Sequence, residues 1–508
     1  MVEKKNSSPP KKTASSSEAK KSDQEMAREA KVEKLIQAGI NLFPHKVQTT
    51  HSVYDITSGF SSETKEDLEK KKVKVVVPGR VISVRRMGRA TFFHITDSRT
   101  KLQIYLREDK VGEKSYELFS LVDIGDVLSV EGELFKTRTE ELTVLADSFM
   151  FLAKCFHPLP EKWHGLQDVE LRYRKRYLDL IMNPKVGDVF RLRSALISLT
   201  RKFFDKRGYI EVETPMMHPV PGGALARPFK SYHNALGIDL YLRIAPELYL
   251  KRLTIGGFEK VYEINRNFRN EGISVEHNPE FTMLEFYEAY SDYNDMIALT
   301  EELISELCAT LLGTEEIDYG EHKISFKKPW KRIKFMEALA FYSGLSPSRF
   351  ENKESIIEIA STLATDKTAL SYGNALDLLF DKYVKHNLIQ PTFVTNTPTE
   401  ISPLAKESKD NPEETERFEL IIAGMEIANG YSELTDPIEQ LQRFKHQAEK
   451  LKKGEEQSHR VDMDYVQALE YGLPPTGGEG IGIDRLVMIF ANLESIKEVI
   501  LFPLLRPK

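Results

Sequence analysis

The chain has 508 residues and a formal net charge of −6 at pH 7; 41% of its residues are hydrophobic and 29% are charged. This length predicts about two to four domains with sizeable cores. No apolar run approaches the roughly 18 residues that would span a bilayer, so no membrane association is expected. The cysteines are Cys155 and Cys308, which excludes a disulfide framework and a cysteine metal site and favours a reducing, cytoplasmic location.

The N-terminal third begins with a polar tail and continues as a β-rich region. Residues 1–25 are rich in Lys, Ser, Pro and Glu and lack aromatic side chains, so we expect a disordered tail. A helical pattern leads in from about residue 26 and stops near Gly39 and Pro44. Between 73 and 150, five or six short strand-like runs, interrupted at 78–79 and with a helix-like insert near 112–121, predict a small β-barrel. A β-sandwich would have the same composition.

A linker at 156–182 separates the 26–155 region from a second region, 183–508, in which helices alternate with strands. Asn183 and Pro184 are suited to the N-cap and the first position of a helix. Apolar residues recur at helical spacing from 189 to 203, and Gly208 ends that pattern. Residues 209–214 then alternate as a strand and meet Pro215.

Two arginines from distant segments are placed to bind phosphate. Arg485 follows the glycine-rich run 477–482, where spaced glycines let the backbone approach a ligand closely. Arg269, with Glu271 beside it, ends the strand-like run 261–268 far upstream. The pair predicts a nucleotide site that is not a Walker P-loop, because no Gly-x-x-x-x-Gly-Lys-[Ser/Thr] occurs.

These segments, with the runs PGGALARPF (221–229), IAPELYLK (244–251) and HNPEF (277–281), resemble the signature motifs of class II aminoacyl-tRNA synthetases. The resemblance covers about 30–508 and is closest to lysyl-tRNA synthetases of bacterial type, in the aspartate, asparagine and lysine subclass. It implies an α+β fold, with an N-terminal OB-fold anticodon-binding barrel and a catalytic domain built on an antiparallel sheet flanked by helices. It further implies ATP-dependent attachment of L-lysine to tRNA(Lys) through lysyl-adenylate, and a homodimer contact in 183–215.

The ATP site is expected around the strand-like run 280–288. Its residues alternate, with Thr282, Leu284 and Phe286 on one face and Phe281, Met283, Glu285 and Tyr287 on the other. The second face mixes aromatic rings with a carboxylate, as a ligand-facing surface would. By resemblance, Arg269 and Arg485 are catalytic and bind the phosphates, Phe281 stacks on adenine, and Glu271 and His277 lie near the nucleotide.

A metal site is expected on the hairpin-like run 418–429. With a turn at Ala423 and Gly424, Ile421 lies opposite Glu426, and Glu419 shares a face with Glu426 diagonally across the pair. Two carboxylates so close would repel each other unless a metal cation or an arginine lay between them. Mg²⁺, completing its oxygen shell with ATP phosphates, suits this pair, and the resemblance assigns the same two residues.

Carboxylates are needed to choose a substrate with two ammonium groups, because buried acceptors reject uncharged analogues. Glu247 and Glu433 are the candidates, and the related aspartate and asparagine enzymes typically carry glutamine at the position of Glu247. By resemblance, Glu247 and Gly223 lie at the substrate amine, and Tyr287, Asn429, Tyr431 and Glu433 surround the side chain. Glu479 departs from the family pattern, since relatives are often apolar or aromatic there.

The barrel carries basic residues ahead of aromatic ones. Arg85 precedes Phe92 and Phe93 on the next strand, and alternation sends one of the two rings inward. Cationic and aromatic side chains on a small barrel suit single-stranded nucleotides. By resemblance, Phe92 faces the anticodon, and Arg85, Gln103 and Glu141 read bases.

Other functions stay open at this point. An asparaginyl- or aspartyl-type synthetase is disfavoured by Glu247, and a lysyl-transferase acting on a protein is disfavoured by the barrel. A catalytically silent synthetase-like RNA-binding protein would not need Arg269, Glu419, Glu426 and Arg485 together.

Overall fold

The computed structural model describes residues 21–160, 166–350, 352–363, 370–452 and 461–507. Most of the tail expected at 1–25 therefore lies outside the described residues. The chain divides into two compact units, Met1–Gly187 and Asp188–Lys508.

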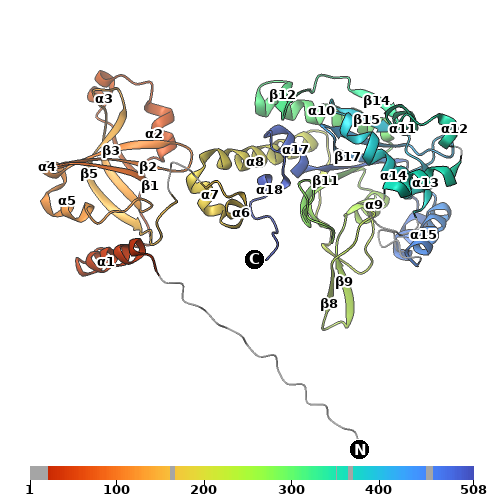
Figure 1. The fold of residues 1–508 in the computed structure, drawn as a ribbon, viewed down its shortest axis with the longest axis horizontal. Helices are drawn as coiled ribbons and strands as arrows, with labels where there is room; N and C mark the ends of the chain where they lie inside the picture. The colour runs from red at the N-terminus through yellow and green to blue at the C-terminus, as the bar shows by residue number, and fades with distance from the viewer. Residues whose placement is uncertain (1–20, 161–165, 351, 364–369, 453–460, 508) are drawn as a thin grey trace, which may run out of the picture. The chain divides into compact units, whose positions relative to one another are not determined.

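The first unit contains a closed five-stranded barrel in the order β1-β2-β3-β5-β4 (Figure 1). This arrangement confirms the barrel and excludes the sandwich. The strands are β1 Lys74–Met87, β2 Ala90–Thr96, β3 Lys101–Arg107, β4 Val127–Lys136 and β5 Leu142–Ala153. The helices are α1 Asp23–Gln37, α2 Val53–Phe60, α3 Lys65–Lys71, α4 Glu108–Val111, α5 Glu113–Phe119, α6 Val169–Arg174 and α7 Arg176–Met182.

Three features of this unit differ from the sequence expectation. The run 73–84 is one continuous strand, because Gly79 lets β1 bend where it changes partner from β4 to β2. A Cβ on Gly79 would lie 2.8 Å from Ile95 Cβ, so only glycine allows this close approach. The leading helix begins at Asp23, before the boundary expected at 26, because Ser22 and Glu25 form a capping box. The presumed linker 156–182 contains α6 and α7.

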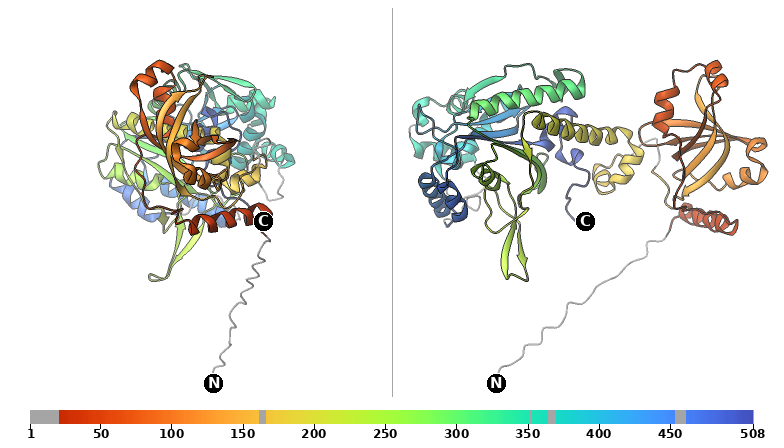
Figure 2. Two further views of the ribbon diagram at one scale, coloured as in Figure 1. Left: turned by 90° about the vertical axis from the view of Figure 1, so that its left-hand side faces the viewer. Right: turned by 180° about the vertical axis from the view of Figure 1, so that it is seen from behind.

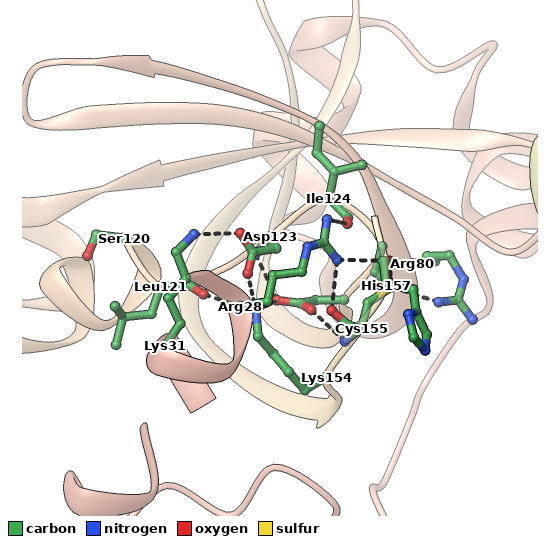
Figure 3. Close-up of polar contacts among 12 residues, drawn as sticks. Arg28, Lys31, Arg80, Ser120, Leu121, Asp123, Ile124, Lys154, Cys155 and His157 are labelled. Atoms are coloured by element: carbon green, nitrogen blue, oxygen red, sulfur yellow. Dashed lines mark hydrogen bonds and ion pairs between the residues drawn. The ribbon is translucent and has the colours of Figure 1, made fainter. Parts of the chain in front are cut away.

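A buried ion-pair cluster joins α1 to the barrel (Figure 3). Lys154 Nζ lies 2.6 Å from Asp123 Oδ2 and 2.7 Å from Asp126 Oδ2, and its side chain is fully buried. Lys31 of α1 binds the other oxygen of Asp123. Arg28 donates to the carbonyl oxygens of Cys155, Ile124 and His157, which fixes α1 against the loop that follows β5.

The second unit is built on an eight-stranded sheet in the order β14-β15-β16-β17-β18-β11-β10-β6 (Figures 1 and 2). It is antiparallel except for the parallel pairs β14–β15 and β10–β6 at its two ends. Its strands are β6 Ile210–Glu211, β10 Lys260–Phe268, β11 Glu280–Ala289, β14 Lys331–Lys334, β15 Thr392–Thr395, β16 Arg417–Ile422, β17 Met425–Ser432 and β18 Thr476–Gly482. The strand expected at 209–214 is shorter in the structure, where only Ile210–Glu211 forms a strand, β6.

Smaller sheets and helices surround this sheet, and the β8–β9 hairpin projects from it (Figure 2). The small-sheet strands are β7 Met217–His218, β8 Lys230–His233, β9 Ile238–Leu242, β12 Glu316–Tyr319 and β13 His322–Ser325. The helices are α8 Pro184–Asp205, α9 Glu247–Ile255, α10 Tyr293–Leu312, α11 Phe335–Ser343, α12 Pro347–Phe350, α13 Lys353–Leu363, α14 Tyr372–Tyr383, α15 Pro437–Lys452, α16 Met463–Glu470, α17 Ile483–Phe490 and α18 Ile496–Val499, with 3-10 turns at Lys385–Asn387 and Thr399–Ile401. No described helix is long and apolar enough to cross a membrane.

The alternation predicted for β11 separates a core face from an open face. Leu284 and Phe286 belong to the main hydrophobic core, together with residues of α8, α10 and α17. Arg193 of α8 ties these layers together, because it pairs with Asp484 at the start of α17 and donates to Thr282 Oγ1 at 2.9 Å. Asp484 Oδ2 also accepts the Thr282 backbone N–H at 2.6 Å. The opposite face of β11 does not pack in this core and is open to form a wall of the site.

Replacing Lys154 by Met should destabilise the barrel, because Asp123 and Asp126 would lose their buried cation. Breaking one side of a buried pair typically costs about 3–5 kcal/mol. Hydrogen exchange of the β4 and β5 amides in the full chain measures this loss. Lys65→Met is the matched control, since Lys65 forms an exposed pair with Glu69 at 3.9 Å and should change exchange little. Equal exchange in both variants would contradict the prediction.

Candidate active site

A cavity of about 330 Å³ opens on the free face of β11, β17 and β18. Its walls also include the start of α9, the loop between β10 and β11, and the segment 401–405. The predicted site residues that line it are Gly223, Glu247, Arg269, Glu271, His277, Phe281, Tyr287, Glu426, Asn429, Tyr431 and Arg485. Glu419 and Glu433 are not among the lining residues, but Glu419 pairs with the lining residue Asn429 across β16 and β17, and Glu433 lies beside Gly478.

One end of the cavity is cationic. Arg269 places its guanidinium 5.0 Å from the centre of the Phe281 ring, and its Nε has no hydrogen-bond partner among the described residues. Desolvation lowers the pKa of Arg269, and the neighbouring carboxylates Glu426 and Glu271 offset part of that effect. A buried donor without a partner carries a free-energy cost that a bound anion would relieve.

Arg485 lies at the same end, at the beginning of α17. It donates to the Glu426 carbonyl oxygen at 2.6 Å, and its second terminal nitrogen lies 3.2 Å from His277 Nε2. Partial burial and the charge of Arg485 lower the pKa of His277, so the imidazole is neutral at pH 7 and accepts from Arg485. The two arginines predicted from distant segments therefore face one cavity.

The two carboxylates of the β16–β17 hairpin interact electrostatically. Ile421 pairs with Glu426 as predicted, and the turn residues Ala423 and Gly424 both have positive φ. Burial and the charge of Glu426 raise the pKa of Glu419 to about 7. Burial disfavours the Glu426 carboxylate, but Arg485 and other nearby cations outweigh it and lower that pKa. Each carboxylate has an arginine beside it, Arg417 at 2.7 Å from Glu419 and Arg485 at 3.7 Å from Glu426.

Oxygen ligands of this kind fit Mg²⁺. No group of three or more His, Cys, Asp or Glu side chains is placed to hold a metal ion within the described part of the chain. Any ion at Glu419 and Glu426 would therefore need further oxygens from a bound phosphate or from water, which suits an ion that arrives with a nucleotide.

The other end of the cavity is acidic and aromatic. Tyr431 donates to Glu247 Oε1 at 2.6 Å, and no described residue donates to Glu247 Oε2. Glu285 lines the same wall, and among the described residues its carboxylate accepts a hydrogen bond only from Tyr287, at 3.4 Å. Burial, followed by the charges of Glu247 and Glu263, raises the pKa of Glu285 well above its usual range. A cationic ligand would stabilise the ionised carboxylate of Glu285 and so offset the free-energy cost of burying it.

Glu433, which the sequence predicts beside the substrate side chain, lies on the same face of the sheet as Tyr287. Its side chain is fully buried and forms an ion pair with Lys251 of α9. Glu433 Oε1 has no hydrogen-bond partner among the described residues, and it lies on the ligand-facing side of Gly478, whose Cβ, if present, would be 2.2 Å from it. Burial raises the pKa of Glu433 to about 8, although Lys251 lowers it.

Sequence reasoning did not assign roles to Glu285, Lys251 or Arg417. Arg417 donates to Asn429 Oδ1 at 3.0 Å and to Glu419 Oε1 at 2.7 Å, so it links the two ends of the site. Its position opposite Tyr431 in the hairpin register could have indicated this role. Glu285 was already placed on the ligand-facing side of β11, whereas nothing in the sequence brings Lys251 to Glu433.

The predicted anticodon residues lie together on the outside of the barrel. Phe93 is in the core, and Phe92 faces outward and stacks on Tyr105 with ring centres 4.3 Å apart. Arg85 pairs with Phe92 across β1 and β2, and Gln103 donates to Glu141 at 2.8 Å. These contacts form a single aromatic and polar surface.

Comparison with known proteins agrees with this geometry. Residues 168–506 match the family described as tRNA synthetases class II (D, K and N), and residues 75–152 match the OB-fold nucleic acid binding domain. The lysine–tRNA ligase of Pelotomaculum thermopropionicum is 53% identical over 95% of this chain and 94% of its own length. That of Legionella pneumophila (strain Corby) is 52% identical over 94% and 97%, and that of Bacillus subtilis is 48% identical over 96% and 98%.

The chain belongs to the lysine–tRNA ligase family of class II tRNA synthetases. The OB-fold barrel and the class II catalytic domain implied by the sequence are both confirmed. The departure at Glu479 does not change the cavity chemistry of this family member, because the Glu479 side chain points to the core face. There both its oxygens accept from Thr300 Oγ1 of α10 at 2.6 Å.

Replacing Gly478 by Ala should damage the acidic end of the cavity, because the new Cβ would lie 2.2 Å from Glu433 Oε1 and 2.4 Å from the Tyr287 ring. Overpacking of this kind costs about 1–3 kcal/mol of unfolding free energy, measured by chemical denaturation. Gly482→Ala on the same strand is the control, since its Cβ would meet nothing closer than 3.6 Å. Equal stability of the two variants would contradict the prediction.

Proposed function

We propose that the protein attaches L-lysine to tRNA(Lys) with ATP, through a lysyl-adenylate intermediate. The observation that carries the proposal is the polarity of the cavity. One end presents Arg269 and Arg485, and the other presents the carboxylates Glu247 and Glu285. An amino acid with two ammonium groups complements the acidic end, while its carboxylate and the ATP phosphates complement the cationic end.

The activation step requires positioning and charge neutralisation. A carboxylate oxygen of lysine forms a bond to the α-phosphorus of ATP, and the bond from that phosphorus to the bridging oxygen breaks as pyrophosphate leaves with the electron pair. No proton has to move. Arg269 neutralises charge that develops on the α-phosphate, and Arg485 holds the remaining phosphates. Phe281 stacks on adenine, with Glu271 and His277 beside the nucleotide.

Mg²⁺ held by Glu419 and Glu426 would supply further neutralisation of the phosphates when bound. The proximity of the two carboxylates on neighbouring strands, through which Glu426 helps to raise the pKa of Glu419, supports the assignment. Arg417 then keeps Glu419 and Asn429 oriented toward their ligands.

Recognition of lysine is proposed to rest on charge. Glu247 and the backbone at Gly223 receive the α-ammonium, and Glu433 and Glu285 with Tyr287 receive the ε-ammonium. Asn429 and Tyr431 close the pocket. Gly223 has φ of +86°, and a Cβ there would lie 3.0 Å from Glu247 Cβ, so glycine keeps this corner open. An aspartate or asparagine side chain offers no cation to Glu285, which disfavours those substrates.

The barrel surface around Phe92 is proposed to bind the anticodon of tRNA(Lys), with Arg85, Gln103 and Glu141 contacting bases. A homodimer through 183–215 and a cytoplasmic location complete the proposal. They rest on the resemblance of that segment to the first class II motif and on the two free cysteines.

Amino-acid-dependent ATP–pyrophosphate exchange across all twenty amino acids tests the function, and lysine is expected to support it. Arg269→Ala should lower the exchange rate by about 10²–10³-fold, as loss of a preorganised charge donor does. Arg266→Ala is the matched control, because Arg266 reaches Glu280 at 3.8 Å and is not among the cavity-lining residues. Exchange with another amino acid, or full activity in Arg269→Ala, would refute the assignment.

Phe92→Ala should weaken binding of tRNA and leave lysine activation intact. Stacking on one base is worth about 1–3 kcal/mol, so the tRNA KM in aminoacylation should rise by about tenfold or more. Pyrophosphate exchange in the same variant is the internal control and should match the wild type. Unchanged aminoacylation, or an equal loss in both assays, would show that Phe92 has a structural role only.

A further inference from the structure

Lys251 is the most deeply buried cation beside the cavity, and the proposed mechanism does not use it. Its side chain is fully buried on α9, with Nζ 2.6 Å from Glu247 Oε1 and in contact with Glu433 Oε2. The ring centres of Tyr431 and Tyr465 lie 5.5 Å and 5.9 Å from the ammonium. Carboxylates on two sides and aromatic rings around it hold the cation in one place.

This ammonium bridges two carboxylates at the acidic end of the cavity. Glu247 lines the cavity, and Glu433 Oε1 lies on the ligand-facing side of Gly478, beside Tyr287. Both carboxylates share one cation, and Glu247 Oε1 also accepts from Tyr431. Oε1 of Glu247 is therefore held in place by two partners, and this fixes the direction in which Oε2 points.

The charged side chains at the acidic end of the cavity can be counted. Glu247, Glu285 and Glu433 are buried carboxylates, and Lys251 is the ammonium in contact with two of them. Glu263, the next carboxylate on the sheet, already forms its own buried pair with Arg243 at 2.6 Å. When a bound dication keeps all three carboxylates ionised, three carboxylates and one ammonium leave two negative charges, which match the two ammonium groups of a lysine ligand.

We infer that Lys251 is a positioning residue that determines specificity: its ammonium holds Glu247 and Glu433 together and sets the charge of the pocket to match a dication. The inference rests on the proposed function and deepens it. Without Lys251 the pocket would contain three negative charges for two substrate cations. Without the Glu433 carboxylate it would contain one.

A cycle of two substitutions gives a result that a purely structural role would not produce. Lys251→Met and Glu433→Gln should each raise the lysine KM in pyrophosphate exchange by about tenfold or more, with a smaller effect on the ATP KM. The double variant Lys251→Met with Glu433→Gln restores two negative charges. Its lysine KM should therefore lie closer to the wild type than that of either single variant.

Lys154→Met is the matched control, because it removes an equally buried ammonium from an aspartate pair in the barrel. It should leave the lysine KM unchanged. The inference is overturned if Lys251→Met keeps the wild-type lysine KM, if it raises the lysine and ATP KM equally, or if the double variant is no better than Glu433→Gln. That last comparison remains decisive even if Lys251→Met alone fails to fold.

The wild-type assay separates this inference from the proposed function. Absence of lysine-dependent exchange in the wild type would refute the function itself. Lysine-dependent exchange without rescue in the double variant would refute only the role of Lys251.

Discussion

The cavity exists because β18 has glycines at its ligand-facing positions, where the neighbouring strands have larger side chains. Gly478, Gly480 and Gly482 all face the ligand side, in the middle of the sheet between β11 and β17. Cβ atoms at Gly478 and Gly480 would come within 2.2 Å and 2.8 Å of neighbouring side chains. The backbone lies so close to Glu433, Tyr287 and Met283 that these residues form the floor of the site directly, and every proposed contact with lysine depends on that floor.

Local patterns in the sequence accounted for the faces of the strands that carry the site. Alternation on β11 separated Leu284 and Phe286 from Phe281 and Glu285, and the hairpin register placed Ile421 opposite Glu426. These features could be predicted because a strand has period two and a turn at Ala423 and Gly424 determines the pairing. The barrel was predictable for the same reason, apart from the bend at Gly79, where a continuous strand changes partner.

The interactions that could not be predicted join residues far apart in the chain. Lys251 meets Glu433, and Arg193 meets Asp484, across sequence separations that no periodic pattern encodes. The sequence predicted Glu433 beside the substrate because a carboxylate suited lysine, and the structure adds a partner within the protein, Lys251. Chemical suitability identified the right residue types here, and only three-dimensional packing assigned the partners.

The position of β18 has a consequence for biosynthesis. It is the last strand of its sheet to leave the ribosome, yet it lies between β17 and β11 and hydrogen-bonds to both. Until it emerges, these two strands present open edges, and such edges pair readily with other chains. Arg193 also lacks its partner Asp484 until that residue is synthesised, 291 residues later. The nascent catalytic unit therefore carries two unjoined half-sheets from the synthesis of β17 until that of β18, which is a period when it needs protection by chaperones.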